Sequence, residues 1–142
     1  WEKMSQFYQR EEFNYNVMLN YNELNQYLGL LSDTNYLCVV LVNNSNEAYD
    51  NEISIFGENY NYYIYNKGKL LADSYDKGNT FSYSISKYND IAIDLENCEI
   101  IYNRNDYKKV DNGINIFIYD YVTDTVVTAV GFDATQDLQI IK

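Results

Sequence analysis

The longest apolar run of the chain, Tyr36–Val42, constrains the fold more than any other segment. Its residues do not alternate between apolar and polar types, so the run predicts a central β-strand that is buried on both faces. It is far shorter than the roughly 20 apolar residues of a membrane-spanning helix. We therefore expect a soluble domain built around this strand, with no direct membrane insertion of this segment.

The first half of the chain predicts strands and helices in alternation. Residues 13–19 alternate apolar and polar side chains, as a strand with one buried face does. Leucines and a tyrosine at helical spacing predict a helix over residues 24–31, and residues 32–35 break that pattern. A second helix is predicted over residues 46–56. The expected caps and stops are Asn20 or Asn22, Ser45 and Gly57.

From residue 60 onward the pattern predicts antiparallel strands joined by short turns. The expected strands cover residues 62–65, 70–71, 81–85, 91–95, 98–102, 114–119 and 126–132, and the expected turns are 66–68, 96–97, 111–113 and 123–124. No linker or internal repeat divides the chain. The 142 residues therefore predict a lead-in segment over 1–12 and one domain over 13–142.

The formal net charge of −11 excludes several classes of partner. Nucleic acids and anionic lipid surfaces are bound by clustered Lys and Arg, which this chain lacks. The chain also contains no His, so its two cysteines cannot form a Cys/His zinc site or a Cys/His nucleophile pair. Cys38 lies in the apolar run, which favours a buried free thiol there over a disulfide with Cys98.

The sequence contains no motif that carries catalysis. It has no nucleophile elbow, no P-loop and no dinucleotide-binding turn, so any catalysis would have to use carboxylates. Asp90, Asp94 and Glu99 fall on the outward positions of their strands, where charge keeps an exposed face solvated. The acidic runs 73–76 and 111–115 lack the spacing of an EF-hand loop and are explained by turn chemistry. We expect no catalytic residues, no metal and no cofactor.

Four tyrosines around the strand 62–65 allow two interpretations. Tyr60, Tyr62, Tyr63 and Tyr65 could form a flat platform of the kind that binds sugars. However, Tyr63 and Tyr65 share one face of the strand and Tyr62 lies on the other. The alternation favours packing of at least one of these sets in the core.

The segments resemble those of a known family in their order and in their residues. The chain is similar, over residues 13–135, to the interleukin-like epithelial-mesenchymal-transition inducers, specifically to bacterial versions on the extracytoplasmic portions of cell-envelope membrane proteins. The most specific stretch looks like the family's Gly-Ile-Asn strand, turn and Phe-Asp hairpin. It comprises Gly113, Ile114, Asn115, Ile116, Tyr119, Asp120, Thr123, Val126, Val127, Phe132 and Asp133.

The resemblance implies an α+β fold, namely an antiparallel two-sheet β-sandwich flanked by two or three helices. In animal members the Gly-Ile-Asn hairpin comes first, so this chain would be a circular permutation of theirs, which chain ends at the surface tolerate. The resemblance also implies that the domain is not an enzyme by itself and that it lies outside the cytoplasm, in a membrane-anchored or secreted bacterial protein.

A sugar pocket of the family falls on Asn44, Asn112 and Glu58 in this sequence. The family carries an acidic residue at the first position and basic residues at the other two, so all three expected charges are lost or reversed here. Because a carboxylate repels anionic sugars, we expect weak binding of a neutral glycan or none. Two functions therefore stay open. The chain is either an accessory carbohydrate-binding domain or a scaffold that binds another envelope protein domain.

Overall fold

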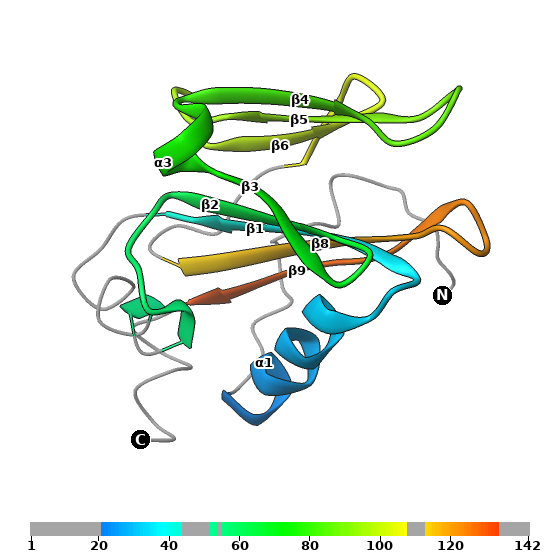
Figure 1. The fold of residues 1–142 in the computed structure, drawn as a ribbon. Coiled ribbons are helices and arrows are strands. Elements are labelled where there is room, and N and C mark those ends of the chain that lie inside the picture. Colours follow the sequence, from blue (N-terminus) through cyan, green and yellow to red (C-terminus); the bar gives the residue numbers. More distant parts are fainter. Residues whose placement is uncertain (1–20, 44–51, 54, 108–112, 134–142) are drawn as a thin grey trace.

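The computed structural model describes residues 21–43, 52, 53, 55–107 and 113–133 of the chain. In that part the chain is mostly antiparallel β-structure in two sheets (Figure 1). The lead-in segment 1–12 and the strand predicted over 13–19 lie outside the described residues, as do Asn44 and Asn112.

The first sheet has five strands in the order β3-β2-β1-β8-β9, and the second has four in the order β4-β5-β6-β7. Every pair of neighbours runs antiparallel. The first sheet contains β1 (Tyr36–Val42), β2 (Tyr62–Asn66), β3 (Lys69–Asp73), β8 (Gly113–Asp120) and β9 (Thr125–Asp133). The second contains β4 (Thr80–Ser84), β5 (Asp90–Asp94), β6 (Glu99–Tyr102) and β7 (Asn105–Tyr107). Figure 1 shows the second sheet lying across one face of the first.

The strand β1 lies at the centre of the five-stranded sheet, as its uninterrupted apolar sequence predicts. It pairs with β2 on one side and with β8 on the other, and every residue from Leu37 to Val42 is buried. Alternate side chains of a strand point to opposite faces, so this burial requires a cover on each face. The prediction of a strand buried on both faces is confirmed.

Each face of the five-stranded sheet has its own hydrophobic core. The intersheet core lies between the two sheets and contains Leu37, Val39, Leu41, Tyr62, Ile64, Ala72, Ile85, Ile91, Ile93, Ile100, Phe117 and Tyr119. The helix-side core lies on the opposite face and contains Leu24, Cys38, Val40, Val42, Tyr63, Ile114, Ile116, Ile118, Val130 and Phe132. Successive residues of β1 therefore belong to different cores. Tyr62 likewise belongs to the intersheet core and Tyr63 to the helix-side core, which confirms that these two tyrosines are core residues.

The helix-side core is covered by α1 (Tyr21–Leu28) and the short 3-10 helix η2 (Gly29–Ser32). The predicted helix is confirmed, although its last turn tightens to 3-10. Asn22 is not its N-cap, because it lies inside α1. Asn20, the other candidate, is outside the described residues.

The second predicted helix is described only at its end. Residues 52, 53, 55 and 56 are helical. The N–H of Gly57 donates to the carbonyl oxygen of Ile53 over 2.9 Å, and Gly57 has φ 78°. A positive φ costs glycine little, so the predicted stop at Gly57 is confirmed. The start, with its proposed cap Ser45, falls outside the described residues.

The turn between β2 and β3 is the one predicted at residues 66–68. Lys67 and Gly68 have φ 55° and 86°. A Cβ atom on Gly68 would lie 2.8 Å from the carbonyl oxygen of Ser32. A side chain at position 68 would therefore clash with the backbone of η2.

Three details differ from the prediction. The connection between β5 and β6 is a turn over residues 95–98 rather than 96–97, and Cys98 has φ 55° there instead of beginning the strand. The strand β7 and the one-turn helix α3 (Ser74–Lys77) were not predicted. Asp73 caps α3, because its Oδ1 accepts a hydrogen bond from the N–H of Asp76 over 2.9 Å.

Candidate functional site

Three chain segments that the resemblance predicts to converge meet at one end of the five-stranded sheet. The N–H of Asn43, just after β1, donates to the carbonyl oxygen of Gly113 at the start of β8 over 2.8 Å. The N–H of Val42 donates to the carbonyl oxygen of Asn61, just before β2, also over 2.8 Å. The end of the central strand, the start of the Gly-Ile-Asn strand and the lead-in to the aromatic strand are therefore side by side.

Of the three predicted site residues, the structure describes only Glu58. Asn44 and Asn112 lie outside the described residues, so their role in binding stays a prediction. Glu58 is exposed and lies against Tyr60. Partial burial raises the pKa of the Tyr60 phenol, and the charge of Glu58 and its hydrogen bond to that phenol raise it further.

A cleft of about 580 Å³ opens at the same end of the molecule. Its lining comes from the ends of both sheets and comprises Val42, Asn43, Asn61, Asn79, Thr80, Leu95, Glu96 and Cys98. The volume lies within the roughly 300–1,000 Å³ of small-molecule sites. We call it the strand-end cleft. Glu58 is not among its lining residues.

Hydrogen bonds hold the polar residues of the strand-end cleft in place. The N–H of Asn61 donates to the hydroxyl oxygen of Ser74 over 2.7 Å. The carbonyl oxygen of Asn79 accepts from the N–H of Leu95 over 2.9 Å. The N–H of Glu96 donates to the Asp94 carboxylate over 3.0 Å. The cleft is thus formed by loop ends on a rigid framework, the usual position of binding residues.

The described residues give this cleft a polar lining of three amides, one hydroxyl, one carboxylate and one thiol. An Asn amide both donates and accepts, and a Thr hydroxyl does the same, whereas a carboxylate accepts. None of the described lining residues is basic, so this part of the lining offers no charge complement for an anionic ligand. Its side chains suit a neutral ligand that is rich in hydroxyl groups.

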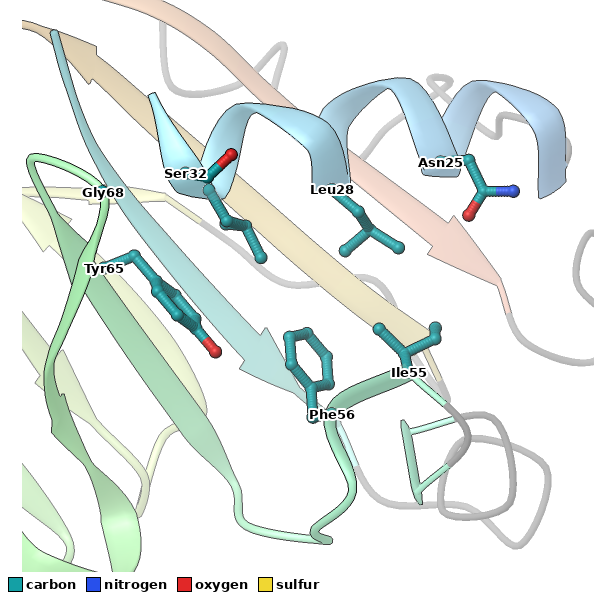
Figure 2. Close-up of a pocket in the computed structure, with 8 residues that line it drawn as sticks. Asn25, Leu28, Ser32, Ile55, Phe56, Tyr65 and Gly68 are labelled. Carbon is teal, nitrogen blue, oxygen red and sulfur yellow. The ribbon is translucent and has the colours of Figure 1, made fainter. Parts of the chain in front are cut away.

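A second cleft of about 490 Å³ lies on the helix side of the five-stranded sheet. Figure 2 shows Tyr65, Phe56 and Leu28 pointing into it from the β2–β3 hairpin, the second helical segment and α1. Its described lining is uncharged and more apolar than that of the strand-end cleft, and comprises Asn25, Leu28, Leu31, Ser32, Ile55, Phe56, Tyr65 and Gly68. We call it the helix-side cleft.

One buried carboxyl group belongs to the second helical segment. Glu52 is fully buried, and its Oε2 accepts a hydrogen bond from the phenol of Tyr63. Its Oε1 has no partner among the described residues. Burial raises the pKa of Glu52 to about 7, and the hydrogen bond from Tyr63 opposes that rise. This group lines neither cleft, so its effect is on the stability of the fold.

Two of the carboxylates considered in the sequence lie at an exposed strand end and in a turn. Asp90 is exposed, and Asp94 accepts a hydrogen bond from the side-chain amide of Asn97 over 2.9 Å in the β5–β6 turn. Among the described residues, no three or more Cys, Asp or Glu side chains gather where they could hold a metal ion. No helix in the described ranges is long and apolar enough to cross a membrane.

No model of a known family, no curated protein and no solved structure matches this chain. The function of the clefts therefore has to be inferred from their own side chains.

The sequence did not single out Asn61, Asn79 or Thr80. Each lies within a residue or two of a strand end, which is the signal that could have identified them. Asn is frequent in the loops of this chain, however, so the residue type alone does not separate these positions from ordinary turn residues.

Proposed function

We propose that this chain is a non-catalytic binding domain with a β-sandwich fold, which takes a neutral glycan into the strand-end cleft. One observation carries the proposal. Both sheets direct amide, hydroxyl and carboxylate groups into a single cleft at the end of the molecule, and none of the described lining residues is basic. Sugar hydroxyl groups both donate and accept hydrogen bonds, and Asn and Thr side chains are complementary to them.

The charge of the chain supports a neutral rather than an anionic glycan. The net charge is −11, and Glu96 places a carboxylate in the cleft. An acidic sugar would have to approach this field without a cationic partner among the described lining residues, which costs affinity. Binding of a neutral glycan is therefore expected to depend little on salt.

The lining also supports binding without hydrolysis. Most glycosidases use two carboxyl groups that flank the scissile bond at about 5–10 Å from each other. Glu96 is the one carboxylate among the described residues that line the strand-end cleft. Within this described lining a bound glycan would meet one acceptor and no second acid or base, so we propose that the domain holds its ligand for a catalytic neighbour.

The resemblance to bacterial interleukin-like epithelial-mesenchymal-transition inducers supports the location that we propose. In that setting the domain lies outside the cytoplasm, as an accessory part of a cell-envelope protein. Protease treatment of intact protoplasts that produce the full parent protein would test this part of the proposal. The added protease is expected to digest the domain, because the domain lies outside the cytoplasm.

Glycan-array screening followed by calorimetric titration tests the binding function. Replacing both Asn61 and Asn79 with Ala should weaken binding of the best neutral glycan roughly tenfold or more, since each lost hydrogen bond is worth about 0.5–1.5 kcal/mol. The matched control is Asn25→Ala, which removes an amide from the helix-side cleft and should leave affinity unchanged. The pair Asn44→Ala, Asn112→Ala tests the two sequence-predicted residues in the same assay.

Two results would contradict this proposal. Tight, salt-sensitive binding of an anionic polymer would exclude a neutral-glycan site. Glycan binding that survives the Asn61, Asn79 double substitution but is lost in Asn25→Ala would move the site to the helix-side cleft.

A scaffold function is the second candidate, and the edge strand β3 favours it. Among the described strands β3 has a neighbour on one side only. Leu70 and Leu71 on it are 51% and 37% exposed. An unpaired edge with exposed leucines can accept a strand from another protein. A Leu70→Lys, Leu71→Lys variant that loses a partner but keeps glycan affinity would assign the two functions to separate surfaces.

A further inference from the structure

The helix α3 presents an exposed tyrosine that is nonetheless held in place. Tyr75 is 79% exposed, but its ring stacks on that of Tyr60 with centroids 5.3 Å apart and planes at 19°. Tyr60 contacts Tyr63 at 6.0 Å, and Tyr63 stacks on Phe56 at 4.3 Å. A column of four aromatic rings therefore runs from the solvent into the helix-side core, and Tyr75 is its outer end.

Hydrogen bonds order the backbone that carries both outer rings of this column. The N–H of Tyr60 donates to the phenol oxygen of Tyr63 over 3.1 Å. The helix that carries Tyr75 is capped by Asp73 and joined to the strand-end cleft by the bond from Asn61 to Ser74. A ring that is already ordered loses little conformational entropy when a ligand stacks on it.

Neighbouring residues of the chain connect the aromatic column to the strand-end cleft. Asn61, which lines the cleft, follows Tyr60 in sequence, and its N–H bonds to Ser74, the neighbour of Tyr75. Asn79, also a lining residue, comes just after α3. Figure 1 shows α3 at the end of the sheets where β1 ends. A ligand longer than one sugar ring could therefore contact the cleft and Tyr75 together.

The groups around Tyr75 indicate what kind of ligand fits. Glu58, Asp73 and Asp76 lie on the adjoining segments, and the one basic group of α3, Lys77, has its Nζ over the ring of Phe81 at 5.8 Å. Pyranose rings offer a C–H face to an aromatic ring and hydroxyl groups to acceptors around it, and an aromatic side chain combines a flat apolar face with a polar tip. The carboxylates accept from such hydroxyls and disfavour an anionic sugar.

We infer that Tyr75, stacked on Tyr60, forms a second subsite beside the strand-end cleft, so that the ligand is a neutral oligosaccharide of two or more units. One unit is hydrogen-bonded by the amides of the cleft, and a neighbouring unit stacks on Tyr75. This inference rests on the proposed function, because it assigns a further part of the same ligand.

Chain-length dependence of affinity tests the inference. The probes are the monosaccharide and the oligosaccharides of two to six units of whichever neutral glycan scores highest on the array. In the wild type, affinity should rise about fivefold to tenfold from one unit to three, the gain expected of one aromatic stacking contact. Tyr75→Ala should abolish that rise while leaving the affinity for the monosaccharide unchanged, and Tyr75→Phe should keep it.

A matched control is provided by Tyr88, which is 80% exposed but lies in the turn between β4 and β5. Tyr88→Ala should leave the chain-length dependence intact. Equal affinity for one and three units in the wild type, or an undiminished rise in Tyr75→Ala, would overturn the stacking subsite and leave the binding function in place. Absence of binding to every glycan would overturn both.

Discussion

The two faces of the five-stranded sheet share the same strands but differ in what their covers bring to them. The cover of the intersheet core is a second sheet, which contributes Ile91, Ile93 and Ile100. The cover of the helix-side core is a set of short helices, and with them come the buried carboxyl group of Glu52 and a bond from the Cys38 thiol to the carbonyl oxygen of Leu30 over 3.6 Å.

The difference follows from the backbone of each cover. A strand directs every second residue into the core, and in β5 those residues are aliphatic. A short helix meets the sheet with few residues, and the backbone carbonyls at its end can accept from side chains of the sheet as well as from backbone N–H groups. The helix-side core therefore lies beside the buried carboxyl group of Glu52 and contains the buried thiol of Cys38, and the pH response of the fold near neutrality is expected to arise there.

The largest expected effect tests whether both faces are equally essential. Val39→Asp and Val40→Asp each place an unpaired charge in a core, the first in the intersheet core and the second in the helix-side core. Each should cost roughly 4 kcal/mol or more and abolish cooperative unfolding, measured by circular dichroism during urea denaturation. The control Ser82→Asp, on the exposed face of β4, should change stability by about 0.5 kcal/mol or less. A soluble Val40→Asp protein that melts near the wild-type temperature would show that the helix cover is dispensable.

The next effect is a dependence of stability on pH that comes from Glu52. Burial raises the pKa of Glu52 from 4.5 to about 7 in the folded protein. Below pH 4.5 the group is protonated in both states; between pH 4.5 and 7 the unfolded state loses its proton first, so stability falls as pH rises. Above that range the loss stays constant at about 3 kcal/mol. Glu52→Gln should therefore stabilise the protein at pH 9 and have little effect at pH 4.

Urea denaturation at several pH values measures this prediction. Glu58→Gln is the matched control, because it removes a carboxylate that is exposed. Its pH profile should follow that of the wild type. If the stability of Glu52→Gln changed with pH in the same way as that of the wild type, another group would have to cause the pH dependence. The two cores would then not differ in their electrostatic contribution to stability.

The smallest effect concerns thiol reactivity and leaves stability unchanged. Burial raises the pKa of the Cys38 thiol to about 12, and the charge of Asp33 contributes, so almost no thiolate forms at pH 8. Cys98 is only half buried, at the edge of the strand-end cleft. Iodoacetamide should therefore label Cys98 in the native protein and Cys38 only after unfolding. Neither Cys38 nor Cys98 forms a disulfide in the structure, and an intramolecular disulfide seen by mass spectrometry without reductant would contradict this arrangement.

The parts of the fold that the sequence predicts are those in which one local signal dominates. This is true of the apolar run of β1, the Lys67–Gly68 turn and the alternation of β5. In each of them one backbone conformation has a clearly lower free energy than the others. The elements that were missed have weak or divided signals. β7 reads Asn-Asp-Tyr and has no alternation, and the Asp73 cap of α3 was explained equally well as a turn. The position of Cys98 in a turn depends on a positive φ that its residue type does not favour.

The candidate site is less accessible to sequence reasoning because it is assembled from distant segments. The convergence of the strand ends could be predicted through the resemblance. The cleft itself could not, because Asn61 and Asn79 acquire their positions only when the second sheet packs against the first. Tyr75 gave no signal in the sequence, since its significance depends on the ring of Tyr60 beneath it.

The pairing of β1 with β8 has a consequence for how the chain reaches this structure. All of the strands β2 to β7 lie between these two partners in the sequence, whereas β8 and β9 form a local hairpin. Closing so long a loop is entropically costly, and non-local strand pairing slows folding. Until it closes, two of the most apolar strands are exposed with unpaired edges, which are templates for aggregation. We therefore expect slow closure of this loop to increase the share of newly made chain that aggregates.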